Sequence, residues 1–162
     1  MRHTFLTSLA WLMMACGCLA QSGEELRVQT RFGVLSLDNQ DRLLFKDRLI
    51  KPGIKANSGI DAGRPFRIGA SDVVLVTIIG GTACPYLYHL VTVSQAGAKA
   101  TNSFGTCNEA LFVERKGDSI SLTMHDYRGP FEPEADKNAA LKRTVVFVFR
   151  DGVVSRDGKP VK

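Results

Sequence analysis

The sequence predicts an all-β fold, either a single-domain antiparallel sandwich or a partly closed barrel of about ten short strands. Short apolar or alternating runs recur along the chain and are separated by turn residues. Two of these runs, 73–79 and 144–149, are rich in β-branched residues and are predicted to lie in the middle of the fold. No long helical period appears, and only residues 134–142, after Pro133, are expected to add a short helical turn.

The first third of the domain predicts short strands joined by turns. Gly33 divides an alternating segment into two strands, and Pro52 ends a hairpin whose tip is at residues 46–48. In chain order we expect two strands within 26–38, a turn at 39–41, a hairpin over 42–50, a long glycine-bearing loop over 54–64 and a strand at 66–68.

The central unit begins with residues 73–79, seven uncharged residues closed by Gly80-Gly81, which fits a strand buried on both faces. Residues 86–93 predict the next strand, because their side chains alternate between two faces. One face is predicted to carry Leu87, His89, Val91 and Val93, and the other Tyr86, Tyr88, Leu90 and Thr92. A third strand is expected to start after Gly97, and this unit ends at residues 104–107.

The last third predicts a tight hairpin, a surface loop and a second apolar strand. The hairpin joins 110–115 to 119–124, in which Ile120, Leu122 and Met124 alternate inward. Residues 128–138 carry two prolines and three acids, which indicates a surface loop. After the strand at 144–149 and a short strand at 153–155, the basic tail 156–162 is expected to be loose.

The chain begins with the pattern of a secretory signal peptide, residues 1–20, followed by the domain 21–162. A short basic start precedes an apolar run that is too short to span a bilayer as a stable anchor. Cleavage after Ala20 is one outcome. Lipidation at Cys18 or Cys16, which follow the apolar run, is the other, and it would attach the protein to the envelope.

The mature chain keeps two cysteines, Cys84 and Cys107, which in an oxidising compartment predict one disulfide. Loss of Arg2 with the leader lowers the net charge from +5 to +4, a mildly basic surface. Export argues against a nucleic-acid partner. The two cysteines, His89 and His125 offer no plausible metal-ligand spacing, so we expect no metal and no cofactor.

No group of residues predicts a catalytic site, so we expect a protein without enzymatic activity. His89 lies within a strand and is interpreted as a satisfied, partly buried histidine. His125 and Asp126 are neighbours on a strand end and point to opposite faces, so they do not form a ready dyad. Glu132 and Glu134 lie in a proline-rich loop and are expected to be solvated. Gly80-Gly81 predicts a sharp turn or bulge.

Two long loops on the β scaffold are the candidate binding elements. In the second, Phe131 is surrounded by acids, as in a protein-contact anchor with a polar rim. The candidate partner-binding residues are Lys55, Asn57, Arg64, Phe131, Glu132 and Glu134.

The residues Gly80-Gly81-Thr82-Ala83-Cys84-Pro85, followed by 104–107 (FGTC), resemble a pattern in small exported proteins of Gram-negative bacteria, which are mostly uncharacterised. The resemblance covers about a third of the mature chain. It implies export to the periplasm and a bond between Cys84 and Cys107, and it assigns no catalytic residue.

We therefore expect an exported protein-binding module, most specifically an inhibitor or an immunity-type protein that binds another protein in the periplasm. Two alternatives remain open. One is an envelope structural or assembly lipoprotein, in contact with the membrane only if Cys18 is lipidated. The other is a carrier of small apolar ligands, which would need a cavity lined by residues 73–79 and 144–149.

Overall fold

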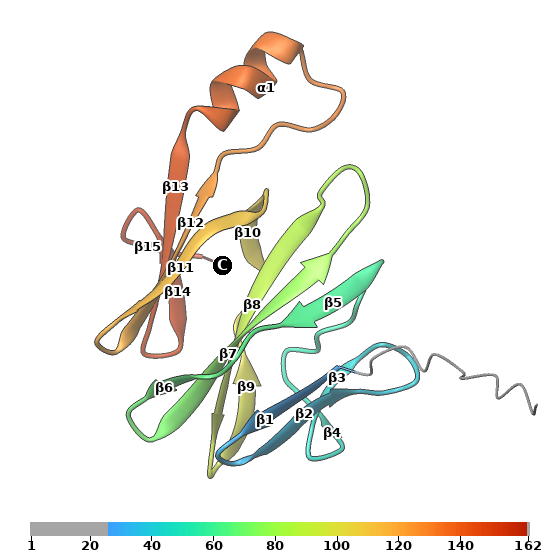
Figure 1. The fold of residues 1–162 in the computed structure, drawn as a ribbon, viewed down its shortest axis with the longest axis vertical. Helices are drawn as coiled ribbons and strands as arrows, with labels where there is room; N and C mark the ends of the chain where they lie inside the picture. The colour runs from blue at the N-terminus through green and yellow to red at the C-terminus, as the bar shows by residue number, and fades with distance from the viewer. Residues whose placement is uncertain (1–25, 162) are drawn as a thin grey trace, which may run out of the picture.

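The computed structural model describes residues 26–161, which form three antiparallel sheets stacked in layers (Figure 1). The central sheet lies between the other two, and none of the three closes into a barrel. The all-β class is confirmed, and of the two predicted architectures the structure has the sandwich. The expected leader 1–20, with Cys16 and Cys18, lies outside the described residues.

Each sheet is built from strands that are consecutive in the chain. The N-terminal sheet has the order β1 (Arg27–Thr30), β2 (Gly33–Leu37), β3 (Leu43–Phe45) and β4 (Arg48–Leu49). The central sheet contains β5 (Gly59–Ala62), β6 (Phe66–Ile68), β7 (Ser71–Ile79), β8 (Tyr86–Ser94), β9 (Gly97–Ala100) and β10 (Phe104–Cys107). The C-terminal sheet has the order β11 (Ala110–Lys116), β12 (Ser119–His125), β13 (Thr144–Arg150), β14 (Val153–Arg156) and β15 (Lys159–Pro160), with helix α1 (Glu134–Leu141) between β12 and β13.

The long strands β7 and β8 pair along their whole length and form the middle of the central sheet. β5 and β6 pair with the outer side of β7, while β9 and β10 pair end to end with the outer side of β8. Both faces of β7 and β8 are covered, which explains why 73–79 is an uninterrupted apolar run. The predicted two-face alternation of 86–93 is confirmed.

Two separate cores lie on the two sides of the central sheet. Val74, Val76 and Val91 face the N-terminal sheet, where Leu35 and Leu43 meet them. The opposite face points to the C-terminal sheet. Its core consists of Val73, Tyr88, Leu90 and Phe104 from the central sheet, with Ile120, Leu122, Met124, Val145, Phe147, Phe149 and Val154 from the C-terminal sheet. The predicted inward alternation in β12 is thereby confirmed.

A buried carboxylate connects the N-terminal sheet to the central one. The side chain of Asp72 is 2% exposed, and its Oδ1 accepts a hydrogen bond from Arg31 Nε at 2.7 Å. Its Oδ2 accepts the backbone N–H of Arg31, also at 2.7 Å. Arg31 lies in the turn between β1 and β2, so this pair fixes that hairpin against the start of β7.

Two connections hold β10 in place beside β8. The predicted disulfide between Cys84 and Cys107 is confirmed, and it joins the end of the β7–β8 turn to the end of β10. Further along, the buried hydroxyl of Tyr88 accepts the N–H of Ala110 at 2.8 Å and donates to the carbonyl of Asn108 at 3.3 Å. Burial is the main cause that raises the pKa of Tyr88.

Four expectations about the elements need correction. Part of the expected loop 54–64 is strand β5, because its backbone completes hydrogen bonds along the edge of β7. The predicted loop 128–138 ends earlier, since α1 begins at Glu134; the predicted helical turn near 134–142 is confirmed. The tail 156–162 is not loose up to residue 161: β15 pairs with β14, and Val161 donates its N–H to Val154. Residues 26–161 contain fifteen strands rather than about ten, because several of them are only two or three residues long.

The strand at 144–149 differs most in its surroundings from what its composition predicts. β13 lies in the middle of the C-terminal sheet, as expected, but only one of its faces is covered. Val145, Phe147 and Phe149 point into the core, while Val146 on the other face is 41% exposed. An apolar face of the sheet is therefore left open to solvent.

Candidate protein-binding surface

The first predicted loop lies beside the end of β7. The N–H of Ser58 donates to the carbonyl of Ile79, which fixes the chain just before β5. Asn57 lines a hollow of about 370 Å³ together with Gly80 and Gly81 of the β7–β8 turn. Lys55 forms an isolated antiparallel bridge with Arg42, the residue before β3. This end of the loop therefore lies against the disulfide-linked turn.

The second predicted loop reaches the same turn from the other side. The hydroxyl of Tyr127 donates to the carbonyl of Thr82 at 3.2 Å. Phe131 follows at the far end of this loop, and its side chain is 97% exposed. The structure therefore brings residues near the two loops, Asn57 and Tyr127, to opposite sides of the β7–β8 turn.

The remaining predicted residues separate into two places. Arg64 lies beyond the other end of β5, where Gly63 donates its N–H to Leu75, so Arg64 is not part of the turn region. Glu132 is exposed beside Phe131, and Glu134 begins α1 with an ion pair to Lys137 at 2.9 Å. The acids therefore remain next to Phe131, as the sequence predicts, whereas the first loop is divided.

An apolar surface that the sequence did not indicate covers part of the outer face of the C-terminal sheet. Phe112 on β11 pairs with Thr123 on β12, which pairs with Val146 on β13, so these three side chains form a row across the sheet. Phe112 is 69% exposed, and neighbouring Leu111 and Val113 are 44% and 36% exposed. We call Phe112 and Val146 the outer apolar surface, because Leu111 lies in the bulge of β11 and Val113 pairs with the core residue Leu122 and so belongs to the other face of the sheet.

The outer apolar surface ends at a strand edge that has no partner among the described residues. β11 pairs with β12 on one side only. In an antiparallel edge strand every second residue turns its N–H and C=O to the free side. The second half of β11 protects its edge with charges, including an ion pair between Glu114 and Lys116. The first half carries a bulge and the exposed apolar residues Leu111, Phe112 and Val113 instead.

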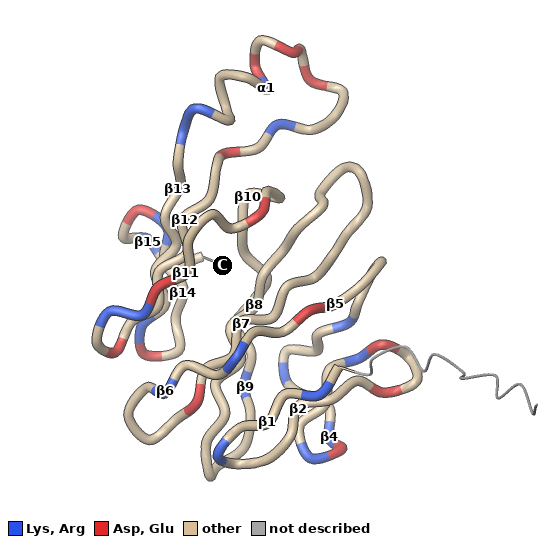
Figure 2. Tube along the Cα trace, in the orientation of Figure 1, with Lys and Arg blue, Asp and Glu red and all other residues tan. Residues whose placement is uncertain are grey.

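Charge is distributed unevenly over the layers (Figure 2). Residues 26–71, which contain the N-terminal sheet, β5 and β6, carry nine basic and four acidic side chains. The loop and helix around α1 carry acidic side chains at Glu132, Glu134 and Asp136. Of these three, Glu134 is paired with Lys137. The region around Phe131 is therefore locally acidic on a protein that is basic as a whole.

The histidines do not assemble a reactive centre with their neighbours. His89 lies on the face of β8 that points to the N-terminal sheet, and its Nδ1 lies 3.0 Å from the carbonyl of Thr101. Burial lowers the pKa of His89. The Nδ1 of His125 is buried without a hydrogen-bond partner. Within residues 26–161, no three His, Cys, Asp or Glu side chains are placed to hold a metal ion, and no helix has the length and apolarity of a membrane span.

The apolar interior is filled by side chains of the two cores. The inward residues of 73–79 and 144–149 are almost completely buried. Among them, Ile78 lines the hollow beside Gly80 and Gly81, and Val73 and Phe149 line an open cleft at the other end of β7. Comparison of the chain with protein-family models, with curated proteins and with solved structures found no match.

Proposed function

We propose that this protein is an exported, non-enzymatic module that binds another protein through the outer apolar surface and the loop that carries Phe131. One observation carries the proposal. Seven of the nine large hydrophobic side chains that are exposed in residues 26–161 follow Cys107 in the sequence. Single exposed apolar residues are ordinary on protein surfaces, whereas their concentration on one part of a molecule is typical of interaction sites.

The composition of this region fits a contact site. Aromatic residues supply much of the binding energy in protein interfaces, and Phe112 and Phe131 are the two most exposed large hydrophobic side chains in the described part of the chain. Phe112 stands on a rigid strand whose neighbours are fixed by the sheet register. Little conformational entropy is therefore lost there when a partner binds.

The charges next to Phe131 define the chemistry of the partner. Glu132 and Asp136 form no side-chain ion pair with a described residue, so both carboxylates are available at the rim of the contact. A complementary partner presents an apolar hollow bordered by Lys or Arg side chains. Among such proteins, an exported enzyme or toxin that is inhibited by the contact fits an inhibitor or immunity-type role in the periplasm.

The experiment compares the mature protein with two variants as bait in periplasmic extract. Phe112→Ser combined with Phe131→Ser removes both aromatic side chains. Leu49→Ser, a change on the N-terminal sheet at a side chain that is 51% exposed, is the matched control. We expect one protein to be retained in a stoichiometric amount by the wild type and the control, and lost from the double variant.

Circular dichroism and thermal unfolding would show that all three proteins are folded. The proposal is wrong if the double variant retains the same proteins as the wild type, or if the only protein retained is a second copy of this chain. Lack of any stoichiometric partner in extracts from several growth conditions would also contradict it.

A further inference from the structure

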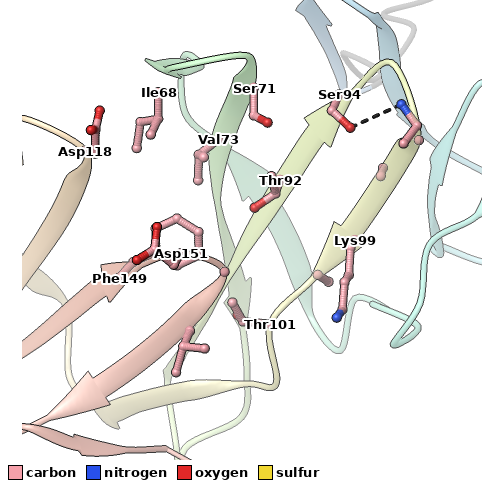
Figure 3. Close-up of a pocket in the computed structure, with 16 residues that line it drawn as sticks. Ile68, Ser71, Val73, Thr92, Ser94, Lys99, Thr101, Asp118, Phe149 and Asp151 are labelled. Atoms are coloured by element: carbon pink, nitrogen blue, oxygen red, sulfur yellow. Dashed lines mark hydrogen bonds between the residues drawn. The ribbon is translucent and has the colours of Figure 1, made fainter.

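A cleft of about 590 Å³ opens between the central and C-terminal sheets (Figure 3). It lies at the ends of β7 and β8 that are farthest from the disulfide, where Ser71 begins β7 and Gly97 begins β9. Here the two sheets diverge, and the turns β11–β12 and β13–β14 form the opposite wall. A volume of this size is within the range of about 300–1,000 Å³ typical of small-ligand sites.

Charges of opposite sign line the two walls of this cleft. Lys99 on β9 belongs to the wall formed by the central sheet, while Asp118 and Asp151 belong to the two turns of the C-terminal sheet. None of the three side chains forms a hydrogen bond or an ion pair with another described residue. The backbone of Lys99 is held by a parallel bridge to Lys51.

The floor between these charges is partly apolar and partly polar. Val73 and Phe149 are almost fully buried and form the apolar part. The hydroxyls of Ser71 and Thr92 also line the cleft, and neither donates to nor accepts from a described residue. Figure 3 shows Thr92 between the side of Lys99 and the side of Asp151. Such a floor can accept both short side chains and backbone amides.

The spacing of the walls defines the size of a ligand that reaches both charges. Sheets that pack face to face lie about 10 Å apart, so the walls of the cleft, where the two sheets diverge, are separated by at least about this distance. An extended peptide advances about 3.3–3.6 Å per residue, so about three residues cover this distance. We propose that the cleft binds a short peptide with free ends, its carboxylate at Lys99 and its ammonium group between Asp118 and Asp151.

The test is an NMR titration of the ¹⁵N-labelled mature protein with tri-L-alanine and two blocked forms, N-acetyl-tri-alanine and tri-alanine amide. We expect the free peptide to shift the amide signals of Val73, Thr92, Lys99 and Gly152. Each blocked form removes one charged contact and is expected to bind about ten-fold more weakly.

Variants then assign each end of the peptide. Lys99→Gln is expected to bind tri-alanine and tri-alanine amide equally well, while it still prefers tri-alanine to N-acetyl-tri-alanine. Asp151→Asn is expected to bind tri-alanine and N-acetyl-tri-alanine equally well, while it still prefers tri-alanine to tri-alanine amide. Asn is suited to position 151, where φ is +52°. Lys142→Gln, at an exposed position outside the cleft, is the control and is expected to bind like the wild type.

Absence of any shift, equal affinity for the three peptides, or shifts confined to the outer apolar surface would each overturn the proposal. It stands apart from the proposed protein contact, because the two sites share no residue and are tested by different variants.

Discussion

Removal of the disulfide is expected to destabilise the protein by an amount that follows from its position in the chain. Cys84 and Cys107 are separated by 23 residues. In the chain-entropy model a closed loop of this length stabilises the folded state by about 3.4 kcal/mol. The free energy of unfolding of ordinary domains is about 5–15 kcal/mol. The Cys84→Ala/Cys107→Ala variant is therefore expected to remain folded, with little stability left.

Urea unfolding followed by far-ultraviolet circular dichroism measures this loss. The sole tryptophan, Trp11, lies in the expected leader, so tryptophan fluorescence would not report on the mature domain. With an m-value of about 2 kcal/mol per molar urea, a loss of 3.4 kcal/mol lowers the midpoint by about 1.7 M. Reduction of the wild-type protein is expected to lower the midpoint by a similar amount.

The result that would refute this reasoning is a loss below about 1 kcal/mol in both the variant and the reduced protein. It would mean that the pairing of β10 with β8 and the contacts of Tyr88 hold this region without help from the covalent bond. A large loss in the variant but not in the reduced protein would instead point to a packing effect of the substituted side chains.

Three further predictions concern single positions. Gly80→Ala is expected to lower the free energy of unfolding by about 2 kcal/mol, because an added Cβ would overlap a backbone carbonyl of the β7–β8 turn. Gly81→Ala, with open space around the glycine, is the control and is expected to change it by less than about 0.5 kcal/mol. Equal losses for the two variants in urea unfolding would contradict this prediction. Asp72→Ala leaves Arg31 without its carboxylate partner and is expected to lower the free energy of unfolding by about 2–3 kcal/mol. An unchanged unfolding midpoint would show that the Asp72–Arg31 pair does not hold the two sheets together. Burial lowers the pKa of His89 in the folded protein. When the pH falls below about 6.5, His89 therefore takes up a proton in the unfolded chain before it does so in the folded protein. The free energy of unfolding is expected to be highest above this pH and to decrease as the pH falls toward the folded pKa. His89→Asn keeps a hydrogen-bond donor but does not titrate. In this variant the free energy of unfolding is expected to depend less on pH between about 7.5 and 5.5, and the same slope as in the wild type would contradict the prediction.

The sequence predicts the centre of this fold well because local pattern and tertiary packing agree there. Residues 73–79 are apolar at every position except Thr77, and the structure covers both faces of β7. The sequence does not predict β5, because there local pattern and tertiary packing disagree. Its residues Gly59 and Asp61 have low strand propensity, and it is a strand because the edge of β7 supplies its hydrogen bonds.

The outer apolar surface could not be predicted, because composition does not tell which side of a strand is covered. Residues 144–149 have the composition of a strand buried on both faces, and only the sheet order shows that one face of β13 is open. The pairing of Asp72 with Arg31 could not be predicted either, because 41 residues separate them in the sequence. Of the predicted contact residues, Phe131 has a clear sequence signal, an aromatic side chain among acids in a proline-containing loop.

The central claim is that a partner protein covers the first half of β11 and the outer face beside it. Hydrogen–deuterium exchange of the complex, compared with the free protein, tests it most directly. We expect slower exchange in the segment 110–114 and in the loop around Phe131, with no change in the N-terminal sheet. Protection confined to β1–β4, or no protection anywhere in residues 108–161, would contradict the account.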